Sequence, residues 1–191
     1  MKRNLIAIIL VLSLVICLPS CFEKKIEENP EFARFNEMFA TGFENYTITV
    51  SSTSESGYTV KNEYTVSTVN GERSVSYKIE TLNKFTVEGD LIEIPKEYVS
   101  VQQGTFNADQ SASESFNVPK FNFSYKCIES DIITPKTFSA DITSLADFAG
   151  ISDTASSAEF SLEYSDNSPA SMQISYVNGD NVTVVITYTF N

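Results

Sequence analysis

The stretch YTVKNEYTVSTVNGERSVSYKIE, residues 58–80, decides the fold of this chain. Apolar and polar residues alternate on both sides of Asn70-Gly71, and this dipeptide is the strongest short signal for a two-residue β-hairpin loop. The loop length predicts which residues face each other across the hairpin. Apolar residues meet at two of three positions, which supports the pairing independently of the turn. The predicted pairs are Val66 with Val75, Tyr64 with Tyr77, and Asn62 with Ile79.

The same period-two alternation continues outward from this hairpin. Tyr46, Ile48 and Val50 share one face of a strand before it. After it we expect a small hairpin at Gly89-Asp90 and a short strand at 98–101, and the alternation over 121–127 predicts a strand. An extended segment follows at 131–142, interrupted by a proline. The small hairpin would pair Val87 with Ile92 and Phe85 with Ile94.

The last third of the sequence predicts a three-stranded meander over 160–190. A five-residue first loop places Tyr164 opposite Met172, and a three-residue bulged second loop places Tyr176 opposite Val182. Both choices keep one continuous apolar face, as a sheet covered by helices or a ligand requires. The polar, Ser-rich segment 102–119 is predicted to be a long loop between strands of this kind.

Two helices are expected. Asn29-Pro30-Glu31 is typical of a helix start, because Asn caps, Pro suits the first turn and Glu complements the helix dipole. An aromatic stripe follows it, and Gly42 can end this helix. A second, short helix is predicted at Leu145–Ala149, capped by Thr143 or Ser144 and closed by Gly150. The stripe consists of Phe32, Phe35 and Phe39 together with Met38.

Composition excludes several functions. The chain has 191 residues, a net charge of −12, no His and no Trp. Without His, neither Ser-His-Asp nor Cys-His catalysis can be built, and the commonest metal ligand is absent. We therefore expect no enzyme activity, no cofactor and no metal site. The acidic balance disfavours nucleic acid as a partner. Cys127 shares the aromatic face of its segment and is expected to be a buried thiol.

The N-terminus carries a targeting signal. Lys2 and Arg3 precede a run of apolar residues at 5–18, shorter than the ~20 residues that a membrane-spanning helix needs. The run ends in Leu18-Pro19-Ser20-Cys21, which resembles the lipobox of bacterial lipoproteins. That resemblance implies cleavage before Cys21 and attachment of diacylglycerol to its sulfur. An uncleaved membrane anchor and a plain secretory signal are the alternatives.

The lipoprotein interpretation divides the chain into a signal peptide (1–20), a lipidated tether (21–28) and one domain (29–191). It predicts a location in the cell envelope, anchored on the outer side of the cytoplasmic membrane, or in the outer membrane if the source has two membranes. The mature chain keeps 11 Lys and Arg against 25 Asp and Glu, a net charge of −14. With Cys21 lipidated, Cys127 has no partner for an intrachain disulfide.

The expected fold is α+β: one domain with a large curved antiparallel sheet, on which the N-terminal helix and the short second helix pack. Its architecture resembles the half-barrel of the LolA and LppX type lipoprotein carriers, while other curved-sheet folds and a cystatin-like fold remain open. The N-terminal helix can cover only a few of at least seven strands. The 102–119 loop, the second helix or a ligand must cover the rest.

Two functions follow from this fold. The first is a non-catalytic, anchored protein that binds a lipid or another hydrophobic ligand, supported by the 14 Phe and 9 Tyr. The second is a structural or protein-interaction module with no small-molecule ligand. The residues proposed to form an apolar ligand face are Phe32, Phe35, Phe39, Tyr64, Tyr77, Phe121 and Phe123.

Overall fold

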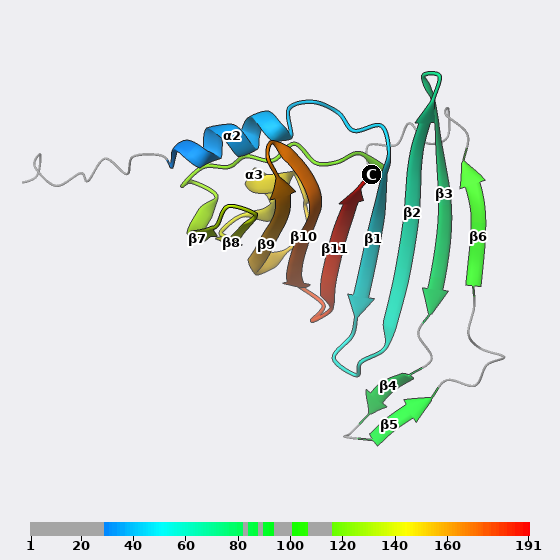
Figure 1. Cartoon of the computed structure of the whole chain (residues 1–191). Coiled ribbons are helices and arrows are strands. Elements are labelled where there is room, and N and C mark those ends of the chain that lie inside the picture. Colours follow the sequence, from blue (N-terminus) through cyan, green and yellow to red (C-terminus); the bar gives the residue numbers. More distant parts are fainter. Residues whose placement is uncertain (1–28, 82–83, 88–89, 94–100, 107–115) are drawn as a thin grey trace, which may run out of the picture.

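The computed structural model describes residues 29–81, 84–87, 90–93, 101–106 and 116–191. Its main feature is one sheet of nine strands, in the order β6-β3-β2-β1-β11-β10-β9-β8-β7, with a separate hairpin β4-β5 (Figure 1). The elements are α2 (Pro30–Met38), β1 (Tyr46–Thr53), β2 (Thr59–Val69), β3 (Glu72–Thr81), β4 (Lys84–Val87), β5 (Asp90–Glu93), β6 (Val101–Phe106), β7 (Ile128–Ile133), β8 (Thr137–Ile142), α3 (Leu145–Ala149), β9 (Ala155–Ser165), β10 (Ser168–Asn178) and β11 (Thr183–Phe190).

Every neighbouring pair in the nine-stranded sheet is antiparallel, and β6 and β7 form its two open edges. The sheet is curved, and both helices lie at the end built from β7 to β10 (Figure 1). This confirms the expected α+β fold with a large antiparallel sheet and two packed helices. We call the face on which the helices pack the inner face. Among the described residues, no helix is long and apolar enough to cross a membrane.

The N-terminal helix α2 starts as predicted. The Asn29 side chain accepts a hydrogen bond from the backbone N–H of Glu31 (3.1 Å), and Pro30 occupies the first turn. The helix ends at Met38 with Phe39 as its C-cap, so the prediction that Gly42 ends it is wrong. The backbone N–H of Phe39 bonds to the carbonyl of Phe35 and closes the last turn without a glycine.

The short helix α3 is confirmed in both its caps. The Ser144 hydroxyl accepts a hydrogen bond from the backbone N–H of Asp147 (3.3 Å), and Gly150 adopts the left-handed conformation (φ +68°). Thr143, the other cap candidate, donates its hydroxyl to the carbonyl of Lys126 instead. The predicted inner face of this helix, Leu145 with Phe148 and Ala149, is buried.

The core is an aromatic cluster between the helices and β8 to β10. Phe35 of α2 is fully buried, and its ring lies 4.8 Å from that of Phe138, 5.4 Å from that of Phe123 and 5.5 Å from that of Tyr164. Tilted and edge-on ring pairs at such separations are favourable beyond their buried area. The aromatic stripe of α2 therefore packs on the sheet, as its helical spacing predicts.

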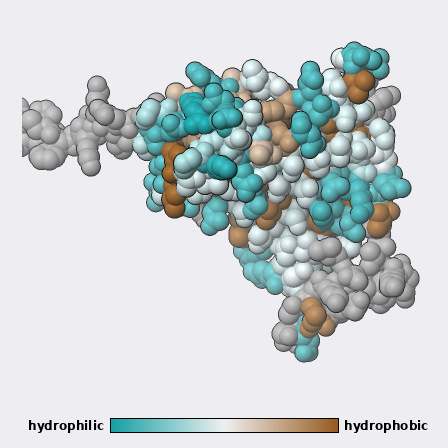
Figure 2. Space-filling model, viewed as in Figure 1, coloured by the Kyte–Doolittle hydropathy of each residue, from teal (hydrophilic) through white to brown (hydrophobic). Residues whose placement is uncertain are grey.

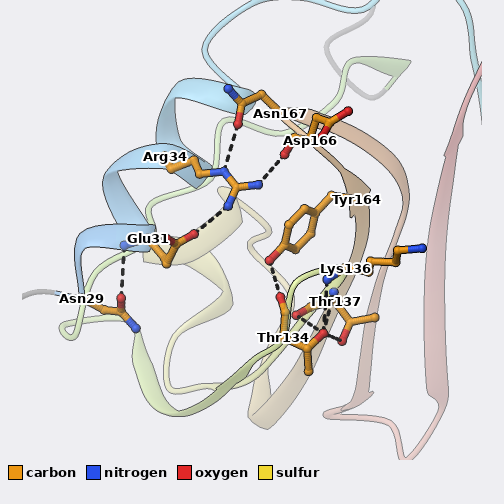
Figure 3. A network of polar contacts seen from close by, with 9 residues as sticks. All are labelled: Asn29, Glu31, Arg34, Thr134, Lys136, Thr137, Tyr164, Asp166 and Asn167. Atoms are coloured by element: carbon orange, nitrogen blue, oxygen red, sulfur yellow. Dashed lines mark hydrogen bonds and ion pairs between the residues drawn. The ribbon is translucent and has the colours of Figure 1, made fainter.

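Arg34 ties the exposed side of α2 to the turn between β9 and β10 (Figure 3). Its guanidinium bonds to Glu31 in the same helix (2.8 Å), to the Asn167 side chain (3.0 Å) and to the Asp166 carbonyl. It also lies 4.9 Å above the centre of the Tyr164 ring, a cation–π distance. These contacts fix the position of α2 along the sheet.

The register of the β2-β3 hairpin is as predicted. The three pairs centred on Tyr64 and Tyr77 are all present, and the two loop residues have positive φ, +54° at Asn70 and +81° at Gly71. Positive φ at both positions is the type I′ geometry that matches the twist of the flanking strands.

Three other predicted registers are wrong. In β4-β5, Val87 pairs with Asp90 and Phe85 with Ile92. In the meander, Met172 pairs with Leu162 and Tyr176 with Val184. The meander pairs are each displaced by two residues, so every side chain stays on its predicted face.

The first meander error comes from a shorter loop than predicted, and a bulge reduces the displacement. The β9-β10 loop contains only Asp166 and Asn167, which alone would set Met172 opposite a serine. The register shifts by one residue between Pro169 and Ser171, and this shift returns Met172 to an apolar partner. Pro169 cannot donate a backbone hydrogen bond, which makes this a suitable place to interrupt the ladder.

Two segments differ from their predicted type. Residues 102–106, assigned to the long loop, form most of the edge strand β6, which pairs with β3. Residues 121–127, predicted to be a strand, are irregular and end in turns before β7. Phe121 and Phe123 are nevertheless buried and Tyr125 is partly buried, because the loop itself runs through the core. Residues 98–100 and 107–115 lie outside the described residues.

Candidate functional site

The inner face of the sheet is closed at one end and open at the other. On β8 to β10, inner residues such as Phe138, Leu162 and Ile174 are 0% exposed. At the other end the burial is mixed: Ile48 of β1 and Val66 of β2 are 2% and 1% exposed, whereas Ile186 of β11 and Tyr64 of β2 are only half-buried. No helix of the described chain covers β2, β3 or β6 (Figure 1). This confirms the expectation that the N-terminal helix covers only part of the sheet.

A segment without regular structure, residues 116–120, crosses the open part of the inner face. We call it the strap. It separates two grooves, since Asn117, Val118 and Lys120 line both.

The larger groove, which we call the main groove, has a volume of about 720 Å³. It lies between the strap, the residues 149–151 that end α3, and the inner side chains Ile186 and Tyr188 of β11. Val118, Pro119 and Ile151 give it apolar walls. The volume falls within the roughly 300–1,000 Å³ of small-molecule sites in proteins.

The smaller groove, about 350 Å³, lies on the other side of the strap. Residues 39–43, which follow α2, form one wall, and Tyr46 and Arg73 from the sheet form another. Its lining thus combines two phenylalanines, a phenol and a guanidinium.

Arg73 holds the strap against the sheet. One of its terminal nitrogens donates to the Phe116 carbonyl (2.7 Å) and to the Tyr46 hydroxyl (2.7 Å), and the other donates to the Asn117 side chain (2.6 Å). The Tyr46 hydroxyl in turn donates to the Phe116 carbonyl (2.5 Å). The Phe116 ring lies 5.0 Å from that of Tyr64. These hydrogen bonds hold Phe116 and Asn117, the first residues of the strap, against the sheet. The strap in turn forms the wall between the two grooves.

The charge around the grooves is unlike that of the chain as a whole. Among the described residues no Asp or Glu lines either groove, whereas the whole chain has 25 acidic residues. Arg73 and Lys120 both line the smaller groove, and neither forms an ion pair with a carboxylate of the described residues. The local potential is therefore more positive than that of the rest of the surface.

Two phenols stay neutral here. Burial raises the pKa of Tyr188 well above its ordinary value, and the neighbouring Tyr46 raises it further. Burial also raises the pKa of Tyr46, although the Arg73 guanidinium opposes the shift. At physiological pH both groups are hydroxyls that can donate and accept hydrogen bonds, without a negative charge that would repel an anion.

The outer face offers a weaker candidate. A hollow of about 280 Å³ lies over β7 to β10 and includes the carboxylates of Asp131, Asp141 and Glu159. Its walls are mostly serine and other polar side chains, and the described residues contain no cluster of three groups suited to bind a metal. Figure 2 shows hydrophobic residues scattered among hydrophilic ones, with no large continuous apolar area on the side in view. The grooves of the inner face are therefore the better candidate.

The residues proposed from sequence as an apolar ligand face fall into two groups. Five of them, Phe32, Phe35, Phe39, Phe121 and Phe123, are buried in the aromatic core, where Phe39 also lines the smaller groove. Tyr64 and Tyr77 lie on the open half. The ring of Tyr77 covers Gly104 on β6, where an added Cβ would lie 2.7 Å from the ring. The structure does not bring all seven together around one space.

Sequence analysis missed most residues that line the grooves. Arg73 could have been identified from the sequence, because period-two alternation places its charge on the same strand face as Val75 and Tyr77. The sequence gives no indication that Lys120 and Ile151 line a groove, since both lie in irregular segments that tertiary contacts bring to the sheet. Ile186 and Tyr188 were assigned to the apolar face of the last strand but not to a site.

The expected buried thiol is confirmed. Cys127 is 1% exposed, and its sulfur lies 3.5 Å from the Asn122 side-chain nitrogen and 3.8 Å from the Ser124 hydroxyl. It is the free cysteine of the described residues. Cys21, the predicted lipidation site, lies outside them.

Comparisons with known proteins give no family. No protein-family model matches the chain, and no curated protein matches it. Among solved structures, one redesigned β-barrel matches with 12% identity and a TM-score of 0.22, covering 83% of this chain and 96% of its own. Another redesigned β-barrel, bound to the compound DFHBI, has 11% identity and a TM-score of 0.21, covering 82% and 98%. The resemblances to lipoproteins and to their carriers therefore remain predictions.

Proposed function

We propose that this protein is a lipid-anchored, extracytoplasmic lipoprotein that binds a hydrophobic ligand in the main groove of its inner face. The anchor is Cys21, and the role is non-catalytic. The observation that carries the proposal is the main groove itself: about 720 Å³, with Val118, Pro119, Ile151 and Ile186 in its lining.

The physical basis is the transfer of apolar surface out of water. A hydrocarbon chain gains about 0.8 kcal/mol for each CH₂ group that it buries. The groove walls at Val118, Ile151 and Ile186 are apolar and lie on three different segments, so a chain between them is contacted from several sides. The lining also includes the polar side chains of Asn117 and Lys120 and the phenol of Tyr188.

A protein-interaction module is the second candidate, and the open sheet favours it. Within the described part of the chain, the edge strands β6 and β7 each pair with a strand on one side only, which leaves backbone groups on the other side for a partner strand. Val101 on β6 is 52% exposed and Ile132 on β7 is 68% exposed. A partner strand added at either edge would be stabilised by backbone hydrogen bonds.

The absence of Trp from the chain allows a direct test. Ile151→Trp places a single fluorophore in the main groove, and Thr189→Trp places one on the exposed outer face of β11, one residue from Tyr188. Both full-length variants are held in phosphatidylcholine nanodiscs and titrated with a bromine-labelled fatty chain, which quenches Trp on contact. Native mass spectrometry of the wild-type chain checks for co-purified lipid.

The proposal predicts saturable quenching of the Trp at position 151 and only weak, non-saturable quenching at position 189. Equal quenching of both variants would show partitioning into the bilayer and not binding in the groove. If position 151 is not quenched and no lipid co-purifies, the hydrophobic-ligand function is rejected in favour of the interaction module.

A further inference from the structure

Two cations lie at the strap between the grooves, a place that we call the junction, and they define the kind of ligand that fits. Lys120 of the strap lines both grooves, and Arg73, which bonds to the start of the strap, lines the smaller one. We propose that the ligand is an anionic amphiphile with one acyl chain: the chain lies in the main groove, and its carboxylate or phosphate head binds Lys120 and Arg73. This inference rests on the proposed function and specifies its ligand.

Charge complementarity carries the argument. The mature chain has a net charge of −14, yet the lining of both grooves contains two cations and no carboxylate. Three other basic side chains are paired with carboxylates, Arg34 with Glu31, Lys61 with Glu63 and Lys78 with Glu80. Lys126 and Lys136 lack such a partner among the described residues, but neither of them lines a groove. An anion at the junction would neutralise two charges that the described protein leaves without a counter-ion.

Arg73 has unused hydrogen-bonding capacity. A guanidinium carries five N–H donors, and the contacts to Tyr46, Phe116 and Asn117 use three of them. The remaining donors can meet an anionic oxygen while the first three keep the strap in place. A planar guanidinium suits carboxylate and phosphate equally, so the head group is defined by its charge and oxygens.

Lys120 is the better residue to test, because it is exposed and makes no hydrogen bond or ion pair within the described residues. Its loss should leave the fold intact, whereas the loss of Arg73 would also release the strap. Lys126 offers a matched control. It is equally exposed and likewise lacks an ion pair, but it lines neither groove.

The experiment measures how strongly the protein prefers an anionic head group over a neutral one. Three proteins are titrated in phosphatidylcholine nanodiscs at a pH where fatty acids are ionised. One carries only the reporter substitution Ile151→Trp and serves as the reference, and the other two add Lys120→Gln or Lys126→Gln to it. The ligands are a brominated fatty acid, the fatty alcohol with the same chain and the corresponding alkyl phosphate. For each variant, the affinity for the acid is divided by the affinity for the alcohol. Comparing this ratio between variants cancels the bilayer's own preference for either ligand.

We expect Lys120→Gln to lower the preference for the acid about 2- to 5-fold, the range of one exposed ion pair, and Lys126→Gln to leave it unchanged. Added salt should reduce binding of the acid and the phosphate but not of the alcohol. Equal binding of acid and alcohol by the reference protein, or equal loss in both lysine variants, would overturn the inference while leaving the hydrophobic-ligand function standing. Failure of all three ligands to bind would reject that function itself.

A competition with inorganic phosphate separates the head group from the whole amphiphile. If the chain provides most of the affinity, free phosphate at millimolar concentration should not displace the alkyl phosphate. Complete displacement by inorganic phosphate would show that the junction is a simple anion site, and would overturn the assignment of an amphiphile.

Discussion

The turn of the β2-β3 hairpin can be tested by a substitution whose cost is almost purely conformational. Gly71 has φ +81°, and a Cβ added there would meet no atom within 4 Å. Gly42 is the matched control: it also has open space around it, but it lacks positive φ. Gly71→Ala and Gly42→Ala therefore add the same methyl group and differ only in backbone conformation.

The magnitude follows from two terms. An alanine in the left-handed region costs about 1–2 kcal/mol. In both variants the loss of glycine restricts the unfolded chain and stabilises the protein by about 0.4–1 kcal/mol. Gly71→Ala should thus be about 1–2 kcal/mol less stable than Gly42→Ala. Gly71→Val should be less stable again, because a β-branched residue resists positive φ more strongly.

Urea denaturation followed by circular dichroism measures these differences as shifts of the midpoint at constant slope. In a chain of this length, 1 kcal/mol corresponds to about 2–4 °C in the melting temperature. If Gly71→Ala and Gly42→Ala have the same stability, the two-residue turn at Asn70 and Gly71 is not the one that sets the register.

Three further predictions concern other parts of the chain. Cys21→Ser should leave the precursor uncleaved and without lipid, whereas membrane-released protein with a free, unmodified Cys21 would exclude the anchor; the intact mass decides. Cys127 should resist a thiol reagent in the folded protein and react after denaturation, and rapid labelling of the native protein would contradict its burial. Burial, together with a hydrogen bond and the charge of Asp153, raises the pKa of Tyr176 to about 12. In the unfolded chain the Tyr176 phenol loses its proton near pH 10. Between pH 10 and 12 the unfolded chain therefore binds fewer protons than the folded chain, and the free energy of unfolding should fall as pH rises through this range. Tyr176→Phe should flatten that part of the pH profile of the urea midpoint, and an unchanged slope would show that other groups cause it.

The sequence predicted those parts of the fold that short-range chemistry determines. Asn70-Gly71 fixes its own loop length, and Ser144 with Gly150 marks both ends of α3, because caps and tight turns depend on a few adjacent residues. Face assignments in the meander were also correct, since side chains alternate with period two even where the register is displaced.

The errors occur where distant contacts override the local pattern. The bulge after Pro169 changes the register by one residue without a distinctive sequence signal. Residues 102–106 are polar because β6 is an edge strand, so they resemble a loop. Alternating aromatics at 121–127 predicted a strand, but the core fills around an irregular segment there.

The candidate site could not be assembled from sequence for the same reason. Its lining comes from the segment after α2, β3, the strap, the end of α3 and β11, which are far apart along the chain. Only the alternation of residues in the strands carried information about it. The strap was assigned to a polar loop, and nothing local indicates that Arg73 holds it on the sheet.

The place of β11 in the sheet has a consequence for how the protein folds. This strand lies between β1 and β10, so the last residues described join the two halves of the sheet. Strands β1 to β3 and β7 to β10 can each pair with near neighbours in sequence, but Tyr46 can meet Phe190 only after the strand at 183–190 has been synthesised. Pairings over such sequence distances are slow because a long loop must close first. Before that point only the two halves of the sheet, β1 to β3 and β7 to β10, can pair, and the inner face with its strap and grooves is completed only when β11 inserts between them.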